Sequence, residues 1–117
     1  MTTIAWRLGH LHSCFAGDWE WTFGGRRRPP AELVNFSPSA AMALERFWVL
    51  IDRWRDSVAA VTPAQLDTVG FDQYPNSDAA ELPFITVIVE ANTEFIHHMA
   101  EIALLRDLYR TRPVGAR

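Results

Sequence analysis

The chain has 117 residues, of which 49% are apolar and 21% charged, so it can bury a core and is predicted to fold as one domain over residues 1–117. The net charge of −3 argues against a dedicated nucleic-acid-binding protein, and the single cysteine, Cys14, excludes an internal disulfide. The sequence has no apolar run of about 18 residues that would span a membrane and no signal-peptide pattern, which predicts a soluble cytoplasmic protein.

The first predicted helix covers residues 3–16. Apolar side chains recur at helical spacing along one face of it, at Ile4, Leu8, Leu11 and Phe15. We expect this helix to end before Gly17. The following stretch is aromatic, with Trp19 and Trp21, and then basic over residues 26–28. It is predicted to be a helix end and a loop; the three arginines are most simply solvated, with an anionic ligand or nucleic acid as the alternative.

Two further helices are predicted in the middle of the chain. Ser37 and Pro38 supply an N-cap and a favoured first residue for the second helix. Its apolar face comprises Leu44, Phe47, Ile51, Trp54 and Val58. Thr62 and Gln65 match a capping box that opens a short third helix, with its stop at Gly70. Residues 71–82 contain proline, asparagine and aspartate and are predicted to be a loop.

The last predicted helix runs from Pro83 to Tyr109 or Arg110, a length of roughly 40 Å. The β-branched residues 87–89 would also suit a strand, but the sequence has no second strand candidate to pair with them. The sequence therefore predicts an all-α fold, most simply an antiparallel up-down helix bundle with three long helices.

A helical wheel of the last helix places most of its apolar residues on one side. That side comprises Phe84, Ile88, Ala91, Phe95, His98, Ile102 and Tyr109. On the same wheel His98 points inward and His97 outward. Arg106 also falls on the inward side, which makes it a weak candidate for binding a cofactor carboxylate, although arginine near a helix C-terminus is favoured by the helix dipole in any case.

Glu94 and His98 lie one turn apart on the same face of this helix, so both can ligate one metal ion. A catalytic zinc site needs a third protein ligand. The candidates are His10, His12, Cys14, Glu90 and Glu101. Glu90 and Glu101 could instead orient a ligand from outside the coordination sphere. The alternative is a surface Glu–His pair without a metal.

Residues 92–102, with the sequence NTEFIHHMAEI, resemble the last helix of the DinB-like superfamily. Residues 2–11, TTIAWRLGHL, resemble the start of the second helix in an actinobacterial branch of that superfamily. The absence of lysine agrees with such a source. The branch includes mycothiol-dependent maleylpyruvate isomerase, in which the first ligand of the last helix is Glu rather than His, as at Glu94 here.

This resemblance implies a four-helix bundle that holds a divalent metal, zinc or nickel, through His10, Glu94 and His98. It also implies a mycothiol-dependent transferase or isomerase that acts on an electrophilic small molecule. The alternative is a non-catalytic helical metal-binding or protein-interaction module. Periodicity alone does not choose between the two histidines of the first helix, since His12 lies about 70° and His10 about 130° from the centre of the apolar stripe.

The resemblance begins at the family's second helix, so the family's first helix is expected to be absent. Three helices of a four-helix design leave an apolar face open, and such faces usually find a partner. We therefore expect the chain to form a homodimer.

Overall fold

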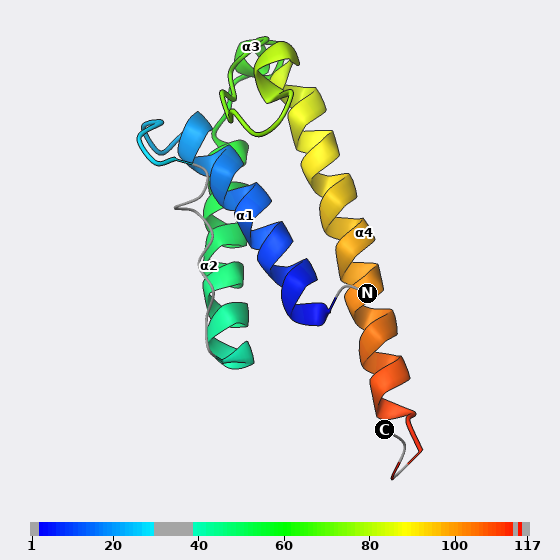
Figure 1. The fold of residues 1–117 in the computed structure, drawn as a ribbon. Helices are drawn as coiled ribbons and strands as arrows, with labels where there is room; N and C mark the ends of the chain where they lie inside the picture. The colour runs from blue at the N-terminus through cyan, green and yellow to red at the C-terminus, as the bar shows by residue number, and fades with distance from the viewer. Residues whose placement is uncertain (1–2, 30–38, 114, 116–117) are drawn as a thin grey trace.

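The computed structural model describes residues 3–29, 39–113 and 115 (Figure 1). Its elements are α1 (Ile4–Thr22), α2 (Ala40–Ala59), α3 (Pro63–Leu66), the 3₁₀ helix η2 (Ala79–Glu81) and α4 (Phe84–Arg110). The described residues form no strand, and only an isolated bridge joins Val69 to Pro83. The predicted all-α bundle with three long helices is confirmed.

Helix α1 lies between α2 and α4 (Figure 1). α1 and α2 run in the same direction, so the up-down order predicted for the bundle does not hold for this pair. The Trp19 indole near the end of α1 donates a hydrogen bond of 3.0 Å to Ser57 near the end of α2. α4 runs in the opposite direction, so Arg7 at the start of α1 meets Glu101 in the second half of α4. The last turns of α4 extend past α1, and the molecule measures 57 × 24 × 23 Å.

Helix α1 is longer than the sequence predicted. It starts as expected, with the Thr3 hydroxyl accepting the Trp6 N–H at 3.1 Å, but it continues through Gly17 to Thr22. Gly17 is buried, and a Cβ atom there would lie 2.3 Å from the ring of Tyr74. The expectation that Gly17 ends the helix was wrong, because this glycine makes room for a distant aromatic ring.

The N-termini of α2 and α3 follow ordinary capping chemistry. The predicted start at residues 37–38 lies outside the described residues; α2 begins at Ala40, with the Ser39 hydroxyl accepting the Met42 N–H. The capping box of α3 is confirmed, since Thr62 and Gln65 each accept the other's backbone N–H. α3 ends at Leu66, before the predicted stop at Gly70.

The predicted bounds of α4 are confirmed, and its first half packs into the core. Phe84, Val87 and Ala91 are buried there. The wheel was wrong for Tyr109, which is 71% exposed because no described element lies beside the final turns of α4.

Among the described residues, none of the helices combines the length and the hydropathy needed to span a bilayer.

Aromatic rings join the three long helices. Phe15 of α1 meets the rings of Trp54 from α2 and Phe95 from α4 edge to face, at 5.8 and 6.1 Å between centroids. Phe47 and Phe84 are fully buried in the same core. Such pairs contribute roughly 0.5–1.5 kcal/mol beyond their burial, so this layer fixes how the helices pack.

Two aspartates fasten the loop after α3 to the second half of α1. Asp72 is fully buried, and its Oδ1 accepts the Tyr74 N–H at 2.8 Å. Burial, together with the negative charge of Asp72, raises the pKa of Asp18 from 3.8 to about 9. The side chains of Asp18 and Asp72 are hydrogen-bonded to each other. Two carboxylates this close cannot both ionise easily, so Asp18 holds the proton that the pair shares at neutral pH.

This shared proton makes the stability depend on pH. Between pH 4 and 9 the native chain keeps a proton at Asp18 that the unfolded chain releases, so this contribution to stability falls as the pH rises. Asp18→Asn replaces the protonated carboxyl with a neutral group of the same shape. We expect it to flatten the pH dependence and to raise the Tm at pH 8 by about 4–8 °C, the effect of ~1 kcal/mol in a small domain.

Thermal unfolding followed by circular dichroism at pH 5, 6.5 and 8 measures this effect. Asp52→Asn is the matched control, since Asp52 is exposed on α2 and pairs with Arg55 of its own helix. An Asp18→Asn variant whose Tm keeps the wild-type slope with pH would contradict the shared proton.

Candidate metal centre

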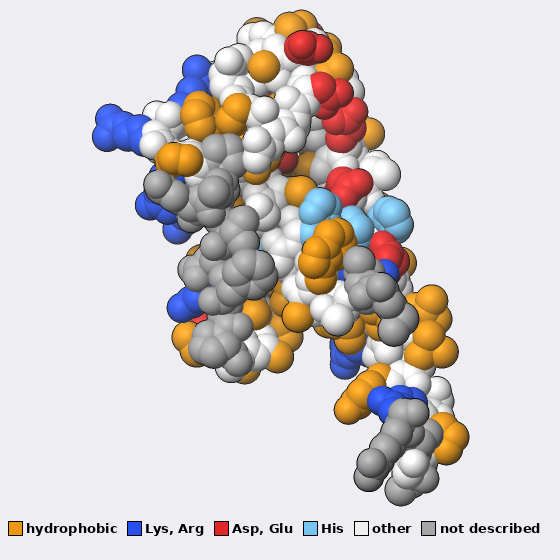
Figure 2. Space-filling view, in the orientation of Figure 1, with side chains coloured by type: hydrophobic (Ala, Val, Ile, Leu, Met, Phe, Trp, Pro, Cys, Tyr) orange, Lys and Arg blue, Asp and Glu red, His pale blue; other side chains and the backbone are white. Residues whose placement is uncertain are grey.

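The structure brings His10 of α1 together with Glu94 and His98 of α4. The Glu94 Oε2 atom lies 3.3 Å from His10 Nε2 and 3.1 Å from His98 Nε2. One ligand atom from each of the three residues lies within 4.8 Å of the others. The antiparallel packing of α1 against α4 creates this proximity, and Figure 2 shows histidines gathered beside acidic side chains on this face of the molecule.

These separations suit a divalent metal ion. Zinc binds histidine nitrogen and carboxylate oxygen at about 2.0–2.2 Å, which separates two tetrahedral ligand atoms by roughly 3.4 Å. The side chain of His98 is 12% exposed, whereas those of His10 and Glu94 are 35% and 45% exposed. An ion between them would therefore be anchored on the buried His98 and open to solvent on the side of Glu94.

Neighbouring rings fix the orientation of His10. Trp6, one turn earlier on α1, stacks on the imidazole of His10 with centroids 5.3 Å apart and planes 3° from parallel. The His98 ring meets His10 edge to face at 4.9 Å. Both imidazoles are thus held with Nε2 directed at Glu94, which lowers the conformational entropy lost on binding an ion.

A carboxylate lies against the other nitrogen of His98. Glu101 Oε1 is 2.9 Å from the buried Nδ1 of His98. The two atoms are at ion-pair distance, but they do not form a hydrogen bond because the Nδ1–H bond points in the wrong direction. Glu101 Oε2 accepts a 2.6 Å hydrogen bond from Arg7 Nε. This bond lowers the pKa of Glu101, so the carboxylate is charged at neutral pH. A carboxylate behind a ligating histidine orients the ring and raises its basicity.

A second group of potential ligands shares His98. His97 Nε2 lies 3.0 Å from Glu101 Oε1, and one ligand atom from each of His97, His98 and Glu101 lies within 4.8 Å of the others. His97 is 63% exposed, as the wheel predicted, and its ring stacks on that of His98. The first group is the stronger candidate, because it draws on two helices and because Glu101 of the second group is already bound to Arg7.

The remaining candidates lie elsewhere. His12 faces the groove between α1 and α2, where burial and the charge of Arg46 lower its pKa. Glu90 and Arg106 are exposed on α4, so the inward position predicted for Arg106 was wrong.

Cys14 is the candidate that comes nearest to the group. Its sulfur lies 3.8 Å from His10 Nε2, but it is not within 4.8 Å of the ligand atoms of all three residues. Burial and the charges of Asp18 and Glu94 raise the pKa of this thiol to about 11, which keeps it protonated at neutral pH.

Sequence reasoning overlooked two residues that support the site, Trp6 and Arg7. Both lie about one turn before His10, and that spacing was the available signal. Their partners could not be foreseen, because the ring stack depends on side-chain rotamers and Glu101 belongs to another helix.

The fold and the three-residue cluster define an all-α bundle with a candidate divalent-metal centre between two antiparallel helices. The family model of the DinB superfamily matches residues 1–102, so the chain belongs to this superfamily. Metal binding is general in the superfamily. Neither the comparison with curated proteins nor that with solved structures gave a significant match. The ligand set His10, Glu94 and His98 stays a prediction, as does the narrower actinobacterial branch.

Removing the negative charge behind His98 tests the role of Glu101. We expect Glu101→Gln to weaken zinc binding by about 10- to 100-fold while the helical content is kept. Isothermal titration with zinc measures the change. Glu90→Gln removes the same charge from an exposed position on the same helix and should bind zinc like the wild type. If both substitutions weakened zinc binding equally, Glu101 would act only through its negative charge and not by orienting His98.

Proposed function

We propose that the protein binds one divalent metal ion, zinc or nickel, through His10, Glu94 and His98. The observation that carries the proposal is the convergence of two histidines, His10 of α1 and His98 of α4, onto one Glu94 oxygen. Membership of the DinB superfamily supports it. Histidine and carboxylate ligands suit both metals, so the donor set alone does not choose between them.

We further propose that the metal centre serves a thiol-dependent transferase or isomerase, with mycothiol as the thiol and an electrophilic small molecule as the substrate. Bound divalent metal lowers the pKa of a thiol or water at its open position and so supplies a nucleophile near neutral pH. The resemblance of residues 92–102 to the mycothiol-dependent branch supports this assignment. The open side next to Glu94 gives a thiol access.

Each side chain around the metal would have a distinct role. His98 is buried and backed by Glu101, so it anchors the site, and Trp6 holds the ring of His10 in place. Cys14 keeps its proton and does not compete with an external thiol as nucleophile. In this proposal the side chains of the protein hold and orient the metal, and the external thiol is the nucleophile.

One observation favours the alternative, a non-catalytic metal-binding or interaction module. Of the two cavities described, one lies between α1 and α2, and the other is lined by residues such as Phe15, Ile51 and Phe95. Neither is lined by His10, Glu94 or His98. A substrate pocket beside the metal would thus need walls from a further element or a second molecule.

Metal content after native purification tests the site. We expect about one zinc or nickel ion per chain in the wild type, and loss of it in the Glu94→Ala/His98→Ala double variant. His97→Ala is the matched control, since it removes an exposed histidine of the same helix and should retain the metal. Loss of metal in His97→Ala with retention in Glu94→Ala would instead assign the ion to the second group.

The thiol-dependent activity has its own test. The metal-loaded protein is incubated with mycothiol and an electrophile such as maleylpyruvate, and loss of free thiol and isomerisation of the substrate are followed separately. Turnover that disappears in the double variant supports the enzyme. Full metal occupancy without turnover of any electrophile tried would favour the non-catalytic module.

We also propose that a second copy covers the apolar residues of α4 beyond the core. Leu104 and Leu108, one turn apart on the projecting end, are 59% and 57% exposed, and Ile96 is 68% exposed. Residues four positions apart form a continuous stripe that a partner helix can cover. No charged residue lies between them in that stripe.

Sedimentation velocity tests the dimer. We expect the wild type to sediment as a dimer at tens of micromolar and Leu104→Glu/Leu108→Glu to sediment as a folded monomer, because charges on the stripe would have to be desolvated in the interface. Asp107→Asn changes an exposed residue next to Leu108 in the sequence but outside the row of residues four apart, and it should leave the dimer intact. A wild-type monomer at that concentration would refute the proposal.

A further inference from the structure

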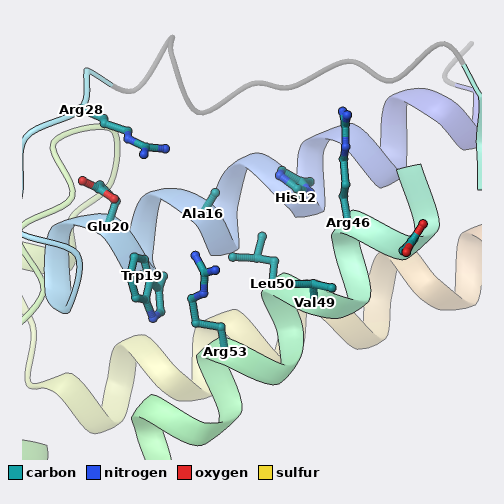
Figure 3. Close-up of a pocket in the computed structure, with 10 residues that line it drawn as sticks. His12, Ala16, Trp19, Glu20, Arg28, Arg46, Val49, Leu50 and Arg53 are labelled. Carbon is teal, nitrogen blue, oxygen red and sulfur yellow. The ribbon is translucent and has the colours of Figure 1, made fainter. Parts of the chain in front are cut away.

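A groove of about 620 Å³ lies between α1 and α2, away from the candidate metal centre (Figure 3). α1 separates the two sites, with His10 directed at α4 and His12 lining the groove. The three cationic side chains of the groove come from two parts of the chain, since Arg28 follows α1 whereas Arg46 and Arg53 belong to α2.

Arginines outnumber acids along the groove. Three arginines line it with two acids, Glu20 and Glu45, in a chain whose net charge is −3. Arg46 and Arg53 are seven residues apart and so lie two turns apart on one face of α2. In Figure 3 the guanidinium group of Arg53 points from α2 toward α1 beside Trp19 and Ala16, and Arg28 extends toward the groove from the loop after α1.

Trp19 holds Arg53 in position. The Arg53 guanidinium lies 4.9 Å from the centroid of the Trp19 ring, and the Trp19 indole N–H is fixed by its hydrogen bond to Ser57. Stacking occupies the face of a guanidinium and leaves its N–H donors, which lie in the plane, available to an acceptor. Arg53 is therefore preorganised to bind a carboxylate or phosphate with two parallel hydrogen bonds.

Part of the wall is apolar. Val49 and Leu50 of α2 and Ala16 of α1 line the groove beside the arginines. A ligand that satisfied both surfaces would carry an acidic group at one end and an apolar body at the other. The volume is within the range of about 300–1,000 Å³ usual for small-molecule sites.

We propose that this groove binds a small organic anion, a carboxylate or phosphate ester with an apolar body, held by Arg28 and Arg53. Val49 and Leu50 face the apolar part of the ligand, and Trp19 keeps Arg53 in place. This site is separate from the proposed metal centre and does not depend on it.

Titration of the ¹⁵N-labelled protein with benzoate and with phenyl phosphate, followed by NMR, tests the proposal. The Trp19 indole N–H and the Arg53 Nε–H should shift in a saturable manner, with the Trp19 signal assigned from Trp19→Phe. Benzyl alcohol, which has the apolar body without the charge, should bind about tenfold more weakly or not at all. Inorganic phosphate that bound as tightly as phenyl phosphate would overturn the role of the apolar wall.

Two variants separate a built site from general attraction. Arg53→Gln should weaken binding by about tenfold or more, as should Arg28→Gln, which leaves the stack on Trp19 intact. Arg55→Gln is the control, because Arg55 carries the same charge on the same helix, is 73% exposed and pairs with Asp52 outside the groove. Equal weakening in Arg55→Gln, or no saturable shift with either anion, would overturn the proposal.

Discussion

The antiparallel packing of α1 against α4 is the constraint on which the rest of the molecule depends. It sets a register in which the first turns of α1 face the middle and second half of α4, so that Arg7 meets Glu101 and His10 meets Glu94 and His98. The same helix must pack against α2 on its other side, where it runs parallel to its neighbour. A shift of one turn, about 5.4 Å, would separate the candidate ligands by more than a metal ion can bridge.

The polar residues between α1 and α4 are placed at different depths. Asp18 sits where the loop after α3 covers the end of α1, and burial there favours its neutral form. Near the other end the packing opens, and Glu94 is exposed enough to stay hydrated. The aromatic layer around Phe15 lies beside this polar row and supplies the packing that holds the two helices at a fixed distance. Stability and the candidate chemistry therefore rest on separate residues of one interface.

The two proposed sites use opposite sides of α1. His10 and His12 are two residues apart, which turns their side chains about 160° away from each other on a helix. One therefore reaches the acidic face of α4, and the other reaches the arginines of α2. Because a single helix presents both, a ligand in the groove and a metal ion at the centre would stabilise the same element, each by mass action on the folded state.

The sequence by itself determined the local features: the extent of α4, the capping box of α3, and the position of Glu94 and His98 on one face. These follow from spacings of three and four residues, which helix geometry converts directly into proximity. Only the tertiary structure decided that α1 passes through Gly17, that Arg106 and Tyr109 are exposed, and that His10 rather than His12 faces Glu94. The physical reason is that each of these depends on which helix or loop packs beside the residue, and periodicity within one helix carries no information about its neighbour.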